Sequence, residues 1–113
     1  MIRQDTFGKQ VKSIYLGIGS NLGNRKINLN IAKFMLSKYN IKIIESSGFY
    51  ESLSWPDPNK PKFLNIVLKI RTDLPPIKLL HKCKEIERIL GRKKTKKNAP
   101  RVCDIDILDY GKI

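Results

Sequence analysis

The chain has 113 residues and a formal net charge of +13 at pH 7, with 41% hydrophobic and 29% charged residues. This length allows one domain with one modest core, and the composition excludes a disordered chain. No apolar run approaches the roughly 20 residues that cross a bilayer, and the first twelve residues contain no apolar signal core, so we expect a cytoplasmic protein. The positive charge favours a polyanionic partner, although lysine is abundant along the whole chain and would make it basic without one.

After a flexible tail over residues 1–12, the hydrophobic patterns predict six elements in chain order. They are a strand over 13–20, a helix over 21–39, strands over 41–52 and 62–72, a helix over 75–90 and a strand over 102–110. This βαββαβ order predicts an α+β, ferredoxin-like fold, in which an antiparallel sheet carries two helices on one face. A site is therefore expected on the uncovered face or along the edge loops.

Local signals predict where the two helices begin and end. Asn24 is expected to cap the first helix, and the prolines at 75–76 suit the first turn of the second, which Gly91 would end. An apolar stripe at three- and four-residue spacing makes the first helix amphipathic; it consists of Ile27, Ile31, Phe34 and Met35. Cys83 and Cys103 fall at apolar positions of the second helix and the last strand, so we expect two small buried residues in place of a metal or redox pair.

The last strand carries two carboxylates that should face the same way. Residues two apart in a strand point to one face, so Asp104 and Asp106 project together, whereas Cys103, Ile105 and Ile107 point toward the core. Neighbouring carboxylates repel each other unless a cation joins them, and Mg²⁺ commonly takes one or two carboxylates together with substrate phosphates. A solvated polar strand face is the alternative.

The loop before this strand strengthens the interpretation as a phosphate site. It contains six cations and no acidic residue; they are Arg92, Lys93, Lys94, Lys96, Lys97 and Arg101. A cationic loop next to paired carboxylates is what phosphoryl transfer from a metal–nucleotide complex requires. A solvated basic turn is the alternative.

Two further stretches carry weaker signals. The glycines of GIGSNLGNR (17–25) could present backbone amides to an anion, although a structural turn is the simpler interpretation, and the spacing of a P-loop is absent. In FLN (63–65), Phe63 and Asn65 share one side of the third strand, where an aromatic ring beside an amide could stack on a flat heterocycle and bind its polar edge. A core phenylalanine is the alternative there.

Together, GIGSNLGNR, FYES, KFLN and above all PRVCDIDILDYG resemble the 6-hydroxymethyl-7,8-dihydropterin pyrophosphokinase family, from about Ser13 to the end of the chain. The resemblance implies a ferredoxin-like enzyme of folate biosynthesis. Such an enzyme transfers diphosphate from ATP to the hydroxymethyl oxygen of the pterin and releases AMP. It also implies two Mg²⁺ ions as cofactors and ATP and the pterin as partners. We expect a monomer with no nucleic acid or membrane partner.

Site residues follow from the same resemblance. Asp104 and Asp106 match the magnesium-binding carboxylates, while Arg92 and Arg101 match arginines that hold the phosphates and assist transfer. The further residues implied around ATP are Leu80, Lys84, Glu87, Lys94 and Ile107. The residues implied around the pterin are Ser52, Leu53, Phe63 and Asn65.

Members of this family continue past the strand that ends this chain. The resemblance therefore implies a pyrophosphokinase-like domain over 13–113 that is truncated at its C-terminus. The segment beyond would carry a histidine and an arginine for ATP and a second aromatic ring for the pterin. A catalytically impaired remnant of the family is one alternative. A basic RNA-binding module of the same topology is another, although its third strand would need more exposed aromatics than Phe63 alone.

Overall fold

The computed structural model describes residues 13–91 and 99–111. The tail predicted over 1–12 lies outside the described residues, as do Arg92 and Lys94. The elements are β1 (Ile14–Ser20), α1 (Arg25–Lys38), β2 (Lys42–Ser46), β3 (Tyr50–Ser52), β4 (Phe63–Arg71), α2 (Pro76–Ile89) and β5 (Asp104–Asp109).

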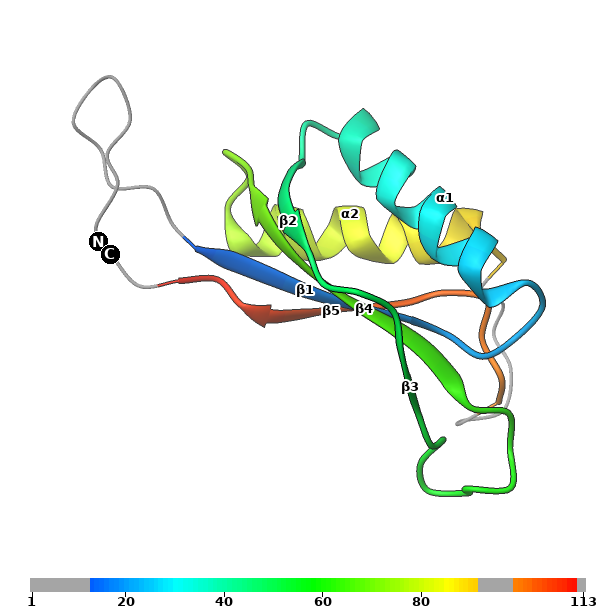
Figure 1. Ribbon diagram of the computed structural model, residues 1–113. Coiled ribbons are helices and arrows are strands. Elements are labelled where there is room, and N and C mark those ends of the chain that lie inside the picture. The colour runs from blue at the N-terminus through cyan, green and yellow to red at the C-terminus, as the bar shows by residue number, and fades with distance from the viewer. Residues whose placement is uncertain (1–12, 92–98, 112–113) are drawn as a thin grey trace.

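The strands form one antiparallel sheet in the order β2-β4-β1-β5, and β3 pairs with β4 beyond β2. Both helices lie on the same side of this sheet (Figure 1). The predicted α+β, ferredoxin-like arrangement is confirmed. No helix within residues 13–91 and 99–111 is long and apolar enough to cross a membrane.

The strand predicted over 41–52 is divided into β2 and β3. Between them, the Ser47 N–H donates to the Val67 carbonyl oxygen, and the Val67 N–H donates to Ser47 Oγ. A serine hydroxyl that takes a ladder hydrogen bond replaces regular strand pairing. Both parts still pair with β4, so the interruption changes the shape of this edge but not the topology.

The predicted helix caps are confirmed, although α1 begins at Arg25 and not at residue 21. Asn24 Oδ1 accepts a hydrogen bond from the Ile27 N–H at 3.1 Å and caps α1. Pro75 and Pro76 open α2, and Gly91 ends it at a φ of +107°, which lies in the left-handed region that favours glycine.

The buried face of α1 differs from the apolar stripe that was used to predict this helix. Ile27, Ile31 and Phe34 are 52%, 40% and 61% exposed. Of the predicted stripe, only Met35 packs against the core. The helix carries apolar residues on two sides, and the side that meets the sheet holds Leu29, Ala32 and Leu36.

The core lies between the helices and one face of the sheet. Its strand residues alternate along the chain with residues of the open face, as period-two geometry requires. On β1, for example, the buried residues Leu16 and Ile18 alternate with Gly17 and Gly19. Cys83 and Cys103 are both buried, as expected.

Candidate pterin and phosphate site

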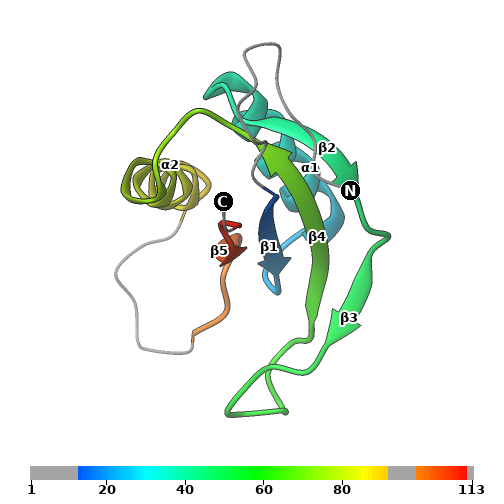
Figure 2. The same ribbon diagram turned by 90° about the vertical axis from the view of Figure 1, so that its left-hand side faces the viewer.

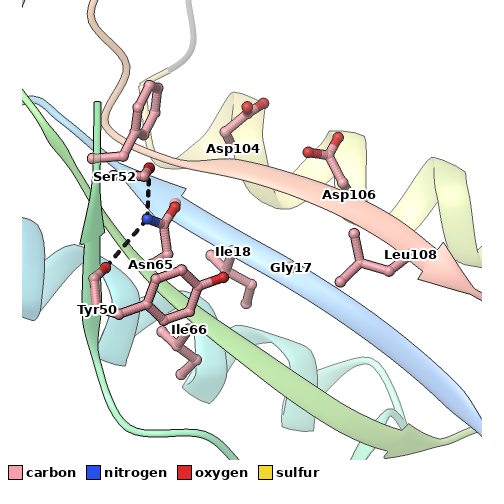
Figure 3. A pocket seen from close by; sticks show the side chains of 11 residues that line it. Gly17, Ile18, Tyr50, Ser52, Asn65, Ile66, Asp104, Asp106 and Leu108 are labelled. Carbon is pink, nitrogen blue, oxygen red and sulfur yellow. Dashed lines mark hydrogen bonds between the residues drawn. The ribbon is translucent and has the colours of Figure 1, made fainter. Parts of the chain in front are cut away.

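A cavity of about 230 Å³ opens on the sheet face that the helices leave uncovered. It brings together five residues predicted from separate parts of the chain; they are Ser52, Phe63, Asn65, Asp104 and Asp106. Figure 3 shows Tyr50, Ser52 and Asn65 on one side of this cavity and the two aspartates on the other.

Strand register explains why these residues meet. Asn65 and Asp104 are both paired with Gly19, from opposite sides of β1, and Tyr50 is paired with Asn65. One row across four strands therefore runs from Tyr50 to Asp104. Because adjacent strands lie about 4.8 Å apart, the backbones of Asn65 and Asp104 are about 10 Å apart.

Glycine at position 19 keeps the middle of this row open. A Cβ there would lie 3.0 Å from Asn65 Oδ1 and 3.1 Å from Phe63 Cδ1. Gly19 therefore gives room to both side chains. Since Gly17 and Gly19 are paired with strands on both sides, they do not form the anion-binding turn considered for this stretch.

The Asn65 carboxamide is held in a defined orientation. Its Nδ2 donates to the Tyr50 carbonyl oxygen at 3.2 Å and to Ser52 Oγ at 2.9 Å (Figure 3). Side chains locked by such bonds can present a polar edge to a ligand without a further loss of rotamer freedom. Leu53 is 62% exposed and does not line the cavity.

The carboxylate pair lies on the open face of β5, as predicted. Asp104 is half-buried and Asp106 is exposed. Asp104 Oδ1 lies 3.2 Å from Arg101 Nη1, which brings the arginine predicted to hold phosphates next to the carboxylates. Arg92 and Lys94 belong to the same predicted set and lie outside the described residues.

The two carboxylates fit a Mg²⁺ ion that takes its remaining ligands from a substrate and from water. Within the described ranges, no group of three His, Cys, Asp or Glu side chains is placed to hold a metal ion. Two carboxylates beside an open cavity suit an ion whose remaining positions are filled by phosphate oxygens and water.

The residues implied around ATP on α2 and at Ile107 lie apart from the cavity. Ile107 packs against the core, and Leu80 and Lys84 are exposed on α2. Glu87 is only 1% exposed, and its Oε2 accepts the Ile105 N–H at 2.7 Å. Lys84 Nζ lies 3.4 Å from Glu87 Oε1. Glu87 therefore binds the β5 backbone between the two aspartates, and the role of these residues toward ATP stays a prediction.

The sequence interpretation missed several residues near the site. Tyr50 and Leu108 line the cavity, and the strand parity of Leu108 with Asp104 and Asp106 was a signal for it. Asn21 and Ser54 are buried polar residues that join loops beside the cavity. No spacing in the sequence marks that contact.

Comparison with known proteins identifies the family of this chain. Residues 15–113 match the family model for 7,8-dihydro-6-hydroxymethylpterin-pyrophosphokinase. The chain is 44% identical over 98 residues to 2-amino-4-hydroxy-6-hydroxymethyldihydropteridine pyrophosphokinase of Aquifex aeolicus, covering 87% of this chain and 61% of that protein. It is 37% identical over 97 residues to the protein of that name in Methylorubrum extorquens, covering 85% and 61%.

A longer relative is also similar. The mitochondrial folate synthesis bifunctional protein of Arabidopsis thaliana is 37% identical over 100 residues, which cover 88% of this chain and 18% of that protein. The chain belongs to the 7,8-dihydro-6-hydroxymethylpterin-pyrophosphokinase family. It spans about 61% of the length of the relatives from Aquifex aeolicus and Methylorubrum extorquens.

Proposed function

We propose that the protein transfers diphosphate from ATP to 6-hydroxymethyl-7,8-dihydropterin in a Mg²⁺-dependent reaction of tetrahydrofolate biosynthesis and releases AMP. One observation carries the proposal: the row that pairs Asn65 and Asp104 with the same residue of β1. An amide suited to a heterocycle and a carboxylate suited to a metal thus face one cavity of about 230 Å³.

The pterin would occupy the part of the cavity formed by β3 and β4. The Phe63 ring offers a stacking surface, and the Asn65 carboxamide offers hydrogen bonds to the polar edge of the ring. Ser52 orients that carboxamide through its hydroxyl. Backbone groups of Ser52 and Leu53 are the further contacts that we propose for the pterin.

The phosphates would occupy the part formed by β5. Asp104 and Asp106 would hold Mg²⁺, which when bound neutralises phosphate charge and orients the oligophosphate. Arg101, 3.2 Å from Asp104, would bind a phosphate oxygen beside the metal site. We assign Arg92 and Lys94 to the same phosphate-binding role, and Leu80, Lys84, Glu87 and Ile107 to the surroundings of the nucleotide.

In the proposed reaction, the hydroxymethyl oxygen of the pterin attacks the β-phosphorus of ATP. A new O–P bond forms, the bond from the β-phosphorus to the bridging α,β-oxygen breaks, and AMP leaves with that electron pair. The proton of the hydroxyl passes to solvent. The chain contributes by fixing the two substrates along one row of the sheet and by placing positive charge at the phosphates. No covalent enzyme intermediate is required.

Release of AMP tests the proposal. The 113-residue chain should release AMP from ATP only when both Mg²⁺ and 6-hydroxymethyl-7,8-dihydropterin are present, with one diphosphorylated pterin formed per AMP. Isothermal titration with α,β-methylene ATP should show binding that requires Mg²⁺. Metal-dependent binding without AMP release would contradict the proposed activity and favour a catalytically impaired remnant. Nucleotide binding that does not depend on Mg²⁺ would contradict the assignment of Asp104 and Asp106 as metal ligands.

A further inference from the structure

Asn21 is a buried amide whose hydrogen bonds all reach other segments of the chain. It directly follows β1 and is 4% exposed. Its Nδ2 donates to Ser54 Oγ at 3.2 Å and to the Pro61 carbonyl oxygen at 3.1 Å. Its Oδ1 accepts the Arg101 N–H at 2.7 Å, and its own N–H donates to the Arg101 carbonyl oxygen at 3.0 Å. Both ends of the carboxamide are therefore used, in opposite directions.

The donating end of the carboxamide closes the connection between β3 and β4. Ser54 and Pro61 stand near the two ends of that connection, and Ser54 Oγ also donates to the Pro61 carbonyl oxygen. The strands on either side carry Ser52 and Phe63, which line the cavity. The carboxamide thus holds the base of the loop from which the proposed pterin contacts extend.

The accepting end holds the segment that enters β5. Asn21 and Arg101 exchange two hydrogen bonds, so the backbone of Arg101 is held in both directions. The guanidinium of Arg101 then reaches Asp104 at 3.2 Å. The β1–α1 turn, the β3–β4 connection and the segment entering β5 lie at the same end of the sheet (Figures 1 and 2).

We propose that Asn21 is a positioning residue that sets the spacing between the pterin half and the phosphate half of the site; this inference rests on the proposed function. Only a carboxamide of this length supplies two donors to one loop and an acceptor to the other. Aspartate would lose both donors, and alanine would leave the Arg101 N–H and the Pro61 carbonyl without this partner. The β3–β4 connection and the segment entering β5 would then lose their direct link and be held relative to each other only through strand pairing with β1.

Asn21→Ala tests the proposal against a matched control, Asn28→Ala. Asn28 belongs to the same junction, and its Nδ2 donates to Ser20 Oγ and the Leu22 carbonyl oxygen. Both variants should lower the melting temperature. At a temperature where each is folded, Asn21→Ala should bind Mg²⁺–α,β-methylene ATP and 6-hydroxymethylpterin each about 10-fold more weakly, as loss of groups that orient a site typically does. Asn28→Ala should bind both as the wild type does. Equal affinities in the two variants would overturn the proposal.

Ser54→Ala tests the pterin half of the site without disturbing the phosphate half. It also takes the place of Asn21→Ala if that variant does not fold. It removes two hydrogen bonds of the β3–β4 connection, from Asn21 Nδ2 to Ser54 Oγ and from Ser54 Oγ to the Pro61 carbonyl oxygen, and leaves both hydrogen bonds between Asn21 and Arg101 in place. It should weaken 6-hydroxymethylpterin binding several-fold and leave binding of Mg²⁺–α,β-methylene ATP unchanged. A loss confined to the nucleotide would contradict the assignment.

Trp55 provides a readout that needs no ligand. It is the single tryptophan of the chain, lies in the β3–β4 connection and is 86% exposed. Time-resolved fluorescence anisotropy should show faster local motion of Trp55 in Asn21→Ala and Ser54→Ala than in Asn28→Ala. Unchanged decay would overturn the proposal. If the wild type binds neither ligand, the proposed function fails, and the Trp55 decay still decides whether Asn21 holds this loop.

Discussion

Along β5 and the residue before it, the side chains that face the helices differ completely from those that face the cavity. Cys103 and Ile105 are buried in the core, whereas Asp104 and Asp106 line the open side. One backbone carries both sets because successive side chains in a strand point to opposite faces. Stability and chemistry are thus divided between alternate residues, and substitutions on the two faces should affect different measurements.

β1 repeats this division with a different residue type. Leu16 and Ile18 are fully buried on the helix side, whereas Gly17 and Gly19, which alternate with them, place only hydrogen atoms on the open side. A strand can lack side chains on one face without weakening the core, because the residues of its other face supply the apolar contacts. The open face of the sheet can then accept a ligand where other sheets would carry side chains.

The largest expected effect comes from the open face of β5. Asp104→Asn and Asp106→Asn should each lower AMP release by about 10³-fold, because each removes charge that would hold Mg²⁺ at the phosphates. Asp106→Asn should change the free energy of unfolding by only about 0.5 kcal/mol, because Asp106 is exposed. Asp104→Asn should cost up to about 1 kcal/mol, because it also weakens the ion pair with Arg101. Urea unfolding and the AMP assay measure the two quantities on the same preparations.

Asp109→Asn is the matched control for these two variants. Asp109 lies on the same strand, is exposed and accepts the Gly111 N–H through Oδ1, which asparagine can still do. It should retain wild-type AMP release. An equal loss in all three variants would mean that general strand electrostatics, and not a metal site, explains the effect.

The reverse pattern is expected on the helix face. Ile105→Ala should lower the free energy of unfolding by about 3 kcal/mol, since it leaves a cavity in a closed core. Below its melting temperature, binding of Mg²⁺–α,β-methylene ATP should stay within about 3-fold of the wild type. Ile105→Val should show a smaller loss of stability, about 1 kcal/mol. A large loss of affinity with intact folding would show that the two faces are not independent.

The sequence was sufficient to predict which residues share the open face of the sheet. Period-two parity alone placed Asp104 with Asp106 and Phe63 with Asn65, and the cavity contains all four. Such predictions succeed because side-chain direction in a strand is a local property of the backbone. The order of elements was equally informative, because few topologies join two such βαβ-type halves.

The residues that the sequence did not reveal depend on contacts between distant segments. α1 carries two apolar sides, and periodicity could not indicate which one meets the sheet. The burial of Glu87 requires a strand N–H supplied from residue 105, and that of Asn21 requires Arg101, 80 positions away. Polar residues of this kind are satisfied only by the tertiary structure.

Glu87 is where the two faces of β5 influence each other, and its substitution should have an intermediate effect. It lies on the helix side but binds the Ile105 N–H, between the two aspartates. Glu87→Leu should weaken binding of Mg²⁺–α,β-methylene ATP about 10-fold, because the strand that carries both carboxylates loses the hydrogen bond from the Ile105 N–H to this side chain. It should also cost about 1–3 kcal/mol of stability for the buried N–H left without an acceptor.

Glu87→Gln distinguishes anchoring of the strand from contact with the nucleotide. The amide oxygen of glutamine can still accept the Ile105 N–H, so this variant should bind the nucleotide within about 3-fold of the wild type. If Glu87 acts through its charge on bound ATP or metal, glutamine and leucine should weaken binding equally. Titration calorimetry of the two variants decides between these roles.

The smallest expected effect concerns the thiol of Cys83, within the closed core. Burial, followed by the negative charge of Glu87, raises the pKa of Cys83 from 9.0 to about 12. Between these values the folded state keeps a proton that the unfolded state releases, so stability should fall as pH rises above about 9, by up to about 1.4 kcal/mol per pH unit. Cys83→Ala should lack this part of the slope in urea unfolding at pH 8, 9 and 10. Parallel pH profiles for the two proteins would show that the thiol ionises as easily inside the core as in the unfolded chain. The side of the sheet that faces the helices would then not be a closed apolar environment, and the contrast with the open side would fail.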